Sequence, residues 1–150
     1  MNTFKMLTTI HFGENALDHL REIPYNRIMI IMDPFVYTSG LYKQITVHLD
    51  AVGKQYTLYS DVVPDAPLNK ITAGVKAFLD YKPDTIIAIG GGSAIDSSKT
   101  IREFALKINP YGKVGLIAIP TTSGTGSEVT SFAVVNDTEA HVKYPLISDS

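Results

Sequence analysis

The hydrophobic residues of this chain fall into short, strand-sized runs separated by stretches in which they recur every three or four positions. Apolar residues at consecutive positions are typical of parallel strands that helices cover on both faces. The runs predict strands at Arg27–Met32, Gln55–Tyr59, Thr85–Ile89 and Val114–Ile119. The spacing between them predicts helices carried by Leu41, Ile45, Leu49 and Val52, by Leu68, Ile71, Val75, Phe78 and Leu79, and by Ser93 to about Leu106. This alternation predicts an α/β fold, a Rossmann-like parallel sheet flanked by helices.

The two ends of the chain predict strands outside that alternation. Thr3–Phe12 has the pattern of an edge strand and leads into a short helix that carries Ala16, Leu17 and Leu20. Near the C-terminus, Ser131–Val135 and His141–Ile147 flank a polar loop. That arrangement predicts an antiparallel hairpin. No repeat or linker interrupts the chain, so we expect one continuous domain.

Composition narrows the possible functions. With 150 residues, 45% of them hydrophobic, the chain is long enough to bury a sizeable core. A formal net charge of -2 offers no basis for binding nucleic acid or an anionic membrane. The absence of cysteine excludes disulfides, thiolate metal sites and thiol nucleophiles, and it suits a reducing cytoplasm. The apolar runs are far shorter than the roughly 20 residues of a membrane helix, and Met1–Ile10 lacks the pattern of a secretory signal.

The most informative segment is the glycine turn between the strand Thr85–Ile89 and the helix that follows it. Gly90, Gly91 and Gly92 stand in a row, and Ser93 is the predicted helix cap. Without Cβ atoms the backbone can approach an anion closely, and the amides and positive end of the helix point at it. Phosphate binding is therefore the first hypothesis, and tight packing of the turn is the alternative. The motif is not Gly-x-Gly-x-x-Gly and follows the third strand, so an ordinary Rossmann assignment does not fit in detail.

Two other strand ends predict polar groups at the same edge of the sheet. Asp33 follows a buried strand, where a carboxylate can accept hydrogen bonds from a ribose 2′-hydroxyl and repel a 2′-phosphate. Its alternative role is local, in a cap or an Asp-Pro turn. Pro120–Glu128 combines four hydroxyls with two glycines and suits a nucleotide, although a flexible loop has the same composition. Ser123 has no evident His and acid partners, which disfavours a hydrolase.

The isolated basic residues carry weaker signals. The four histidines have no metal-ligand spacing and lie in different predicted elements, so we interpret them as surface or packing residues. Lys99 and Lys143 could contact a phosphate or a ribose. A solvated charge is the ordinary interpretation of a lone lysine.

Two long motifs together resemble the iron-containing (group III) alcohol dehydrogenases. They are Ile89–Lys99 and Ile119–Thr130, and they stand in the family's order. The resemblance extends from the N-terminal strand to Ser150. The short connection between the motifs, together with Lys143–Leu146, is most similar to the 1-propanol dehydrogenase branch found in propanediol-using microcompartments and to its ethanol-forming relatives.

The resemblance implies an NAD(H)-dependent hydride exchange between short-chain aldehydes and primary alcohols, such as propanal and 1-propanol. A divalent metal, commonly iron, would polarise the carbonyl oxygen. By position, the residues around the pyrophosphate would be Gly90, Gly91, Gly92, Ser93 and Asp96. The adenosine side and its ribose would contact Thr121, Thr122 and Thr125, and the path toward the nicotinamide would be lined by Val134 and Lys143. Asp33 matches the family's strand-end acid and so favours NAD over NADP.

The family's metal ligands, one Asp and three His, belong to a helical second domain, and no residue here is assigned to them. We therefore expect residues 1–150 to be a truncated N-terminal NAD-binding domain without catalytic residues, inactive by itself. The full-length protein is expected to be a homodimer or higher oligomer acting on a small alcohol or aldehyde. Its expected location is the cytoplasm, including the interior of a bacterial microcompartment.

Two other interpretations stay open. One is a sister NAD enzyme, such as a glycerol-phosphate dehydrogenase or a dehydroquinate synthase, although Thr121–Glu128 favours the alcohol branch. The other is a non-catalytic nucleotide-binding module. Tight NAD binding by these residues alone would favour that module.

Overall fold

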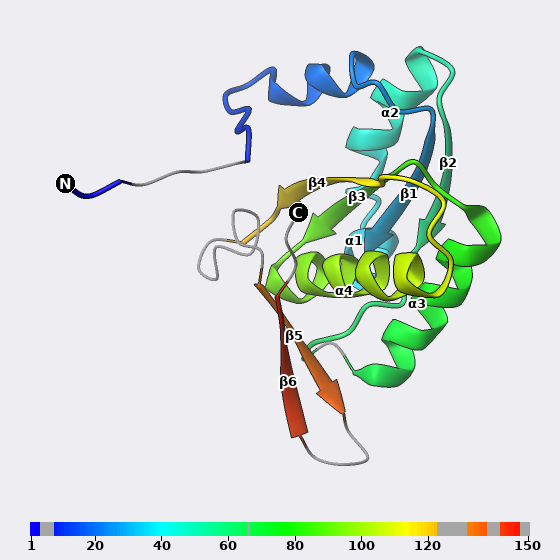
Figure 1. Ribbon diagram of the computed structural model, residues 1–150. Coiled ribbons are helices and arrows are strands. Elements are labelled where there is room, and N and C mark those ends of the chain that lie inside the picture. The colour runs from blue at the N-terminus through cyan, green and yellow to red at the C-terminus, as the bar shows by residue number, and fades with distance from the viewer. Residues whose placement is uncertain (4–7, 66, 123–131, 138–141, 148–150) are drawn as a thin grey trace.

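The centre of the molecule is a four-stranded parallel sheet in the order β2-β1-β3-β4 (Figure 1). The computed structural model describes residues 1–150 except 4–7, 66, 123–131, 138–141 and 148–150. The sheet contains β1 (Arg27–Met32), β2 (Gln55–Tyr59), β3 (Thr85–Gly90) and β4 (Gly115–Pro120). The described helices are η1 (Ala16–Arg21), α1 (Pro34–Thr38), α2 (Lys43–Ala51), α3 (Leu68–Tyr81) and α4 (Gly92–Ile108). The predicted α/β fold with a parallel sheet is confirmed.

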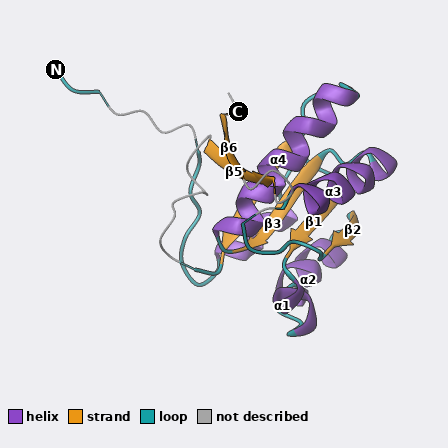
Figure 2. Cartoon of the chain, turned by 90° about the horizontal axis from the view of Figure 1, so that it is seen from below, coloured by secondary structure: helices purple, strands orange, loops and turns teal. Residues whose placement is uncertain are grey.

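Helices cover both faces of the sheet, which explains why its strands are apolar at consecutive positions. Helices α3 and α4 lie on one face, and α1 and α2 lie on the other (Figure 2). From β1, Met29 and Ile31 share a core with Phe78 of α3. The residue between them, Ile30, points the other way and shares a core with Leu49 of α2. All five side chains are fully buried, so each strand face contributes to one of two hydrophobic cores.

The strand order makes two chain segments diverge where the candidate site is expected. The chain passes from β1 to β2 on one side of the sheet and from β3 to β4 on the other. The segments that leave β1 and β3 therefore diverge at their carboxyl ends, and in doubly wound sheets ligands bind at such a point. Asp33 directly follows β1, and Gly91 directly follows β3.

Two helix starts differ from the prediction. After β1 the chain enters the short helix α1, which the sequence patterns did not predict. Asp33 is the N-cap of this helix and Pro34 is its first residue. Helix α4 begins at Gly92 with Gly91 as N-cap, so Ser93 is not the cap. The extended chain leaving β3 continues to Gly91 and turns there, which places Ser93 inside the helix.

The ends of the chain follow the prediction in part. Helix η1 is the expected short helix. Residues 8–12 form no strand, contrary to the edge strand predicted at Thr3–Phe12. Ile10 and Phe12 are 52% and 89% exposed, so no strand of the described chain covers them. Strands β5 (Phe132–Asp137) and β6 (Val142–Ile147) pair antiparallel; residues 138–141 lie outside the described part, and for these two strands only the backbone pairing is described.

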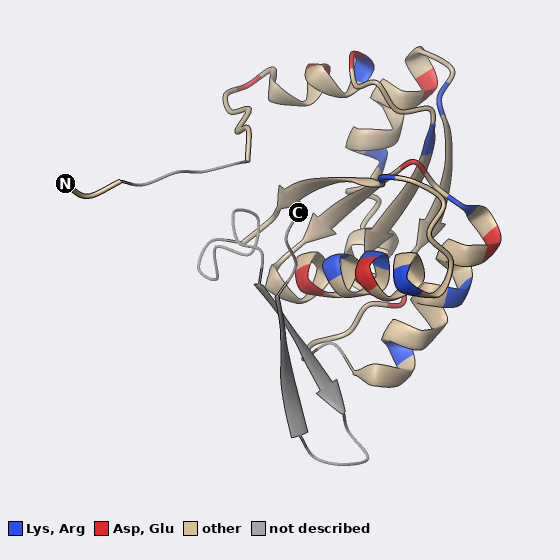
Figure 3. Ribbon diagram, in the orientation of Figure 1, with Lys and Arg blue, Asp and Glu red and all other residues tan. Residues whose placement is uncertain are grey.

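Charges of both signs are interspersed on the described surface. Acidic and basic residues are both present along α4 (Figure 3). No helix in the described ranges is long and apolar enough to span a membrane.

Two tyrosines with raised pKa values predict a loss of stability at alkaline pH. Burial, helped by Asp61 for Tyr59 and by Asp84 for Tyr111, raises the pKa of each hydroxyl to about 12. Both hydroxyls donate to backbone carbonyls, at 2.7 and 2.8 Å. In the unfolded chain they lose their protons near the ordinary tyrosine pKa of 10.0, so the unfolded state binds fewer protons above that pH and the free energy of unfolding falls.

We expect urea midpoints to decrease as the pH rises from about 10 to about 12. A Tyr59→Phe, Tyr111→Phe double variant should show a flatter dependence over the same range. An equal slope in the two proteins would contradict this assignment.

Candidate functional site

A cleft of about 470 Å³ opens at the carboxyl ends of the parallel strands. Four segments line it. The segment after β1 contributes Asp33, Phe35, Val36 and Leu41, and the loop after β2 contributes Val62, Val63 and Pro64. The turn from β3 into α4 contributes Gly91, Gly92, Ser93 and Ala94, and the segment after β4 contributes Thr121 and Thr122. The topology thus brings together three regions that the sequence had singled out separately.

Backbone amides dominate the part of the cleft at the start of α4. The first hydrogen bond within this helix runs from the Ile95 amide to the Gly91 carbonyl, at 3.2 Å. The amides of Gly92, Ser93 and Ala94 precede that bond and therefore have no carbonyl partner within the helix. They lie at the positive end of a 17-residue helix. The arrangement is suited to binding an anion.

The glycines at this turn have two different roles. Gly90 has a φ of 144°, a conformation that favours glycine, and a Cβ there would lie 2.9 Å from the Cβ of Ala94. Gly91 has an extended backbone, but a Cβ there would lie 2.9 Å from Oγ1 of Thr122. Gly90 therefore serves tight packing, whereas Gly91 keeps the floor of the cleft open. Tight packing, the alternative for the glycine turn, thus applies at Gly90, and phosphate binding at this turn stays a prediction.

Asp33 performs the local role that was its alternative interpretation. Its Oδ1 accepts a 2.7 Å hydrogen bond from the Val36 amide and caps α1. Its Oδ2 lies on the side of Gly90, 3.5 Å from where a Cβ would be on that residue. Capping uses one carboxylate oxygen and holds the other beside the glycine turn, so the cap orients Asp33 at the cleft.

The cleft is polar at one end and apolar at the other. The amides of α4 and the hydroxyls of Ser93, Thr121 and Thr122 lie at the polar end. The apolar part is formed by Phe35, Val36, Leu41, Val62, Val63 and Pro64. Asp33 is the one charged side chain among the described lining residues. Phe35 is 73% exposed, which leaves its ring accessible. A ligand with a phosphate, a hydroxylated middle and a flat apolar end matches this distribution.

Other predicted site residues are not brought into the cleft by the described structure. Asp96 lies within α4, two residues beyond the last lining residue of that helix, Ala94. Thr125 falls in 123–131, outside the described residues, and the side chains of Val134 on β5 and Lys143 on β6 are not described. Lys99 is only 5% exposed, so the interpretation of this lysine as a solvated charge is wrong.

The apolar end of the cleft was not predicted. Its wall after β2 contains Val62, Val63 and Pro64. The available signal was the presence of two prolines, Pro64 and Pro67, soon after the strand, because a segment that leaves the carboxyl end of a parallel strand lies at the ligand-binding edge. Among the described residues, no three His, Cys, Asp or Glu side chains group closely enough to hold a metal ion. The metal site implied by the resemblance is therefore assigned to none of them.

A family model for iron-containing alcohol dehydrogenases matches residues 8–150. This chain belongs to the iron-containing alcohol dehydrogenase family. It is 36% identical over 154 residues to the 1-propanol dehydrogenase PduQ of Citrobacter freundii, covering 100% of this chain and 40% of that protein. The resemblance seen in the two sequence motifs is thereby confirmed.

Solved structures share the fold. The NADH-dependent butanol dehydrogenase A of Thermotoga maritima superposes with a TM-score of 0.87 at 23% identity, over 99% of this chain and 42% of that one. The sulfoacetaldehyde reductase of Bifidobacterium kashiwanohense, solved in complex with NAD⁺, gives 0.84 at 27% identity, over 99% and 43%. The chain therefore spans less than half the length of these two proteins and of the C. freundii relative.

The two glycines should respond differently to alanine. We expect Gly90→Ala to cost about 1–3 kcal/mol of stability, because it forces a positive φ on a residue with a Cβ and crowds Ala94. Gly91→Ala should cost less, since its backbone is extended and the Thr122 side chain can rotate. Urea unfolding of both variants measures the difference. Equal losses of stability in the two variants would show that the backbone conformation at position 90 does not require glycine.

Proposed function

We propose that this chain is the NAD-binding part of a metal-dependent alcohol dehydrogenase. The full-length enzyme would interconvert short-chain aldehydes and primary alcohols, such as propanal and 1-propanol. The observation that carries the proposal is the cleft at the divergence of β1 and β3, whose polar end consists of the main chain from Gly91 to Ser93. The bound nicotinamide supplies hydride chemistry, and the residues of this chain bind and orient the nucleotide.

The distribution of polarity along the cleft supports an orientation for NAD. The pyrophosphate would accept hydrogen bonds from the amides of Gly92 and Ser93, and the missing Cβ of Gly91 allows that approach. The adenosine ribose would lie at Asp33. The adenine would then reach the apolar end, where its flat ring can stack on the accessible face of Phe35.

The charge of the cleft favours NAD over NADP. A 2′-phosphate would lie against the Asp33 carboxylate, and no lysine or arginine is among the described lining residues to neutralise it. The hydroxyls of Thr121 and Thr122 can donate to phosphate or ribose oxygens. Thr125, Val134 and Lys143 remain predicted contacts toward the nicotinamide.

The remaining features of the enzyme are proposals from relatives. The family name indicates iron, and metal ligands would come from a second domain. The name of the C. freundii relative supports 1-propanol as a substrate, and the family match favours the alcohol branch over glycerol-phosphate dehydrogenation or dehydroquinate synthesis. An oligomeric full-length protein, and a cytoplasmic location that includes a microcompartment, stay predictions of the resemblance.

Calorimetry with NAD tests the cleft directly. We expect saturable binding by this chain, and Gly91→Val should weaken it at least about tenfold, because a branched side chain fills the space in front of the amides. The thermal midpoint should change little. A second variant, Gly91→Val with Thr122→Ala, removes the hydroxyl that the new side chain meets, and Thr122→Ala alone measures what that hydroxyl contributes to binding. The double variant should bind more weakly than Thr122→Ala if the side chain introduced at position 91 blocks the ligand.

Absence of saturable NAD and NADP binding by the unmodified chain would overturn the proposal. Two results together would instead favour the non-catalytic module. One is very tight NAD binding by the chain, and the other is unchanged turnover in a full-length protein whose cleft is blocked.

Cofactor preference tests Asp33. Asn caps helices as well as Asp does, so Asp33→Asn should keep the hydrogen bond from Val36 while removing the charge. We expect the NAD/NADP affinity ratio to fall by about tenfold, ~1.4 kcal/mol. The control is Asp50→Asn, because Asp50 lies on α2 and does not line the cleft. A preference for NADP in the unmodified chain would contradict the role of Asp33.

A further inference from the structure

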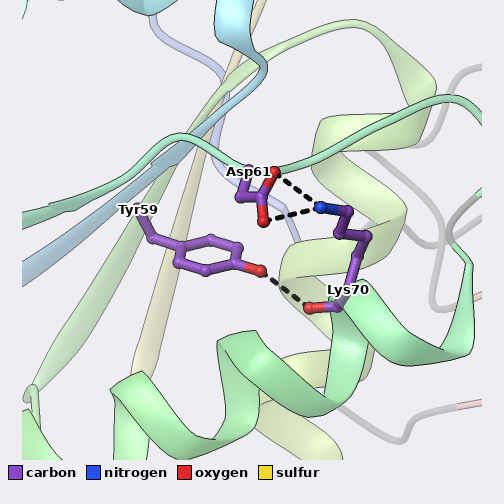
Figure 4. A network of polar contacts seen from close by, with 3 residues as sticks. All are labelled: Tyr59, Asp61 and Lys70. Carbon is purple, nitrogen blue, oxygen red and sulfur yellow. Dashed lines mark hydrogen bonds and ion pairs between the residues drawn. The ribbon is translucent and has the colours of Figure 1, made fainter.

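A polar cluster joins the end of β2 to the first turn of α3. The hydroxyl of Tyr59 donates a 2.7 Å hydrogen bond to the Lys70 carbonyl. The ammonium group of Lys70 donates to both carboxylate oxygens of Asp61, at 2.8 and 2.9 Å (Figure 4). We refer to Tyr59, Asp61 and Lys70 as the clasp. Tyr59 ends β2, Asp61 lies near the start of the loop that connects β2 with α3, and Lys70 lies in the first turn of α3.

The loop held by the clasp carries one wall of the cleft. Val62, Val63 and Pro64 follow Asp61 directly and line the apolar end. Val62 is 2% exposed and belongs to the hydrophobic core on the α3 face. Asp65 has a φ of 65°, so the chain reverses there in a left-handed conformation. The loop is thus anchored in the core by Val62, and the clasp ties the chain just before Val62 to the first turn of α3.

The clasp contributes more to position than to overall stability. The Lys70 and Asp61 side chains are 33% and 52% exposed, and ion pairs at such exposure add little to folding. The Tyr59 hydrogen bond has the modest net value of an ordinary neutral bond. A small displacement of the loop, however, moves the wall against which a flat ring would pack.

We propose that Tyr59, Asp61 and Lys70 are positioning residues for nucleotide binding, holding the Val62–Pro64 wall at the distance that an adenine ring requires. This inference rests on the proposed function. It predicts that loss of the clasp weakens ligands that carry the base and spares ligands that contact only the amides of α4.

The chain offers a matched control on the same strand. The Tyr56 hydroxyl donates to Oδ1 of Asp50 at 2.9 Å, so Tyr56→Phe and Tyr59→Phe each remove one tyrosine hydrogen bond from β2. Tyr56 packs with the core on the α2 face and does not line the cleft. A general effect of losing a hydroxyl should therefore appear in both variants.

Calorimetry with adenosine diphosphate and with inorganic pyrophosphate tests the clasp. Tyr59→Phe should weaken adenosine diphosphate binding by about threefold to tenfold, the range of one hydrogen bond, and leave pyrophosphate binding unchanged. Tyr56→Phe should alter neither. Lys70→Met should resemble Tyr59→Phe, and Lys70→Arg should restore affinity because it keeps the pair with Asp61.

Hydrogen exchange in the ligand-free chain gives an independent readout. The amides of Val62 and Val63 should exchange faster in Tyr59→Phe and Lys70→Met than in Tyr56→Phe. Unchanged adenosine diphosphate affinity, or equal losses for both ligands, would overturn the positioning role. If the unmodified chain binds neither ligand, the proposed function fails. Unchanged hydrogen exchange at Val62 and Val63 in Tyr59→Phe and Lys70→Met would separately overturn the positioning role of the clasp.

Discussion

The close approach of three chain segments at Gly90 and Gly91 is the constraint on which the cleft depends. A Cβ at the first position would meet Ala94, and one at the second would meet Thr122. The absence of both atoms lets β3 pass directly into α4 while the segment after β4 lies against the turn. Asp33 reaches the same point from β1. The cleft is therefore a product of backbone packing, and few of its polar contacts come from long side chains.

The sheet makes this packing possible because its strands are buried on both faces. Met29 and Ile30 belong to different cores although they are neighbours in the chain. The central strands are consequently held from two sides, and their carboxyl ends are fixed relative to each other. Membership of the iron-containing alcohol dehydrogenase family and the superposition on solved relatives agree with this arrangement.

Sequence patterns predicted the parts of the fold that repeat regularly. The strands and the long helices follow from runs and from helical spacing, and the glycine turn follows from composition. Helix α1 was missed because five residues are too few to show a period. The cap at Ser93 was wrong because the end of β3, which the local sequence does not define, decides where the turn occurs.

The candidate site was predictable only where its chemistry is local. Asp33 and the glycines stand out by residue type, whereas Val62 and Val63 resemble any apolar pair until the strand order places them opposite the turn. At Ile10 and Phe12 the error is a strand that was predicted from the local pattern and is absent. Both side chains are exposed, and no strand of the described chain pairs with this segment.

The polar end of the cleft is built from amides and hydroxyls, and these groups carry no titratable proton near neutral pH. Under the proposed function, recognition of a diphosphate at this end would need no titratable side chain. In the described part of the cleft Asp33 is the one charged side chain, so under the proposed function a single codon change at that position would shift the preference between coenzymes.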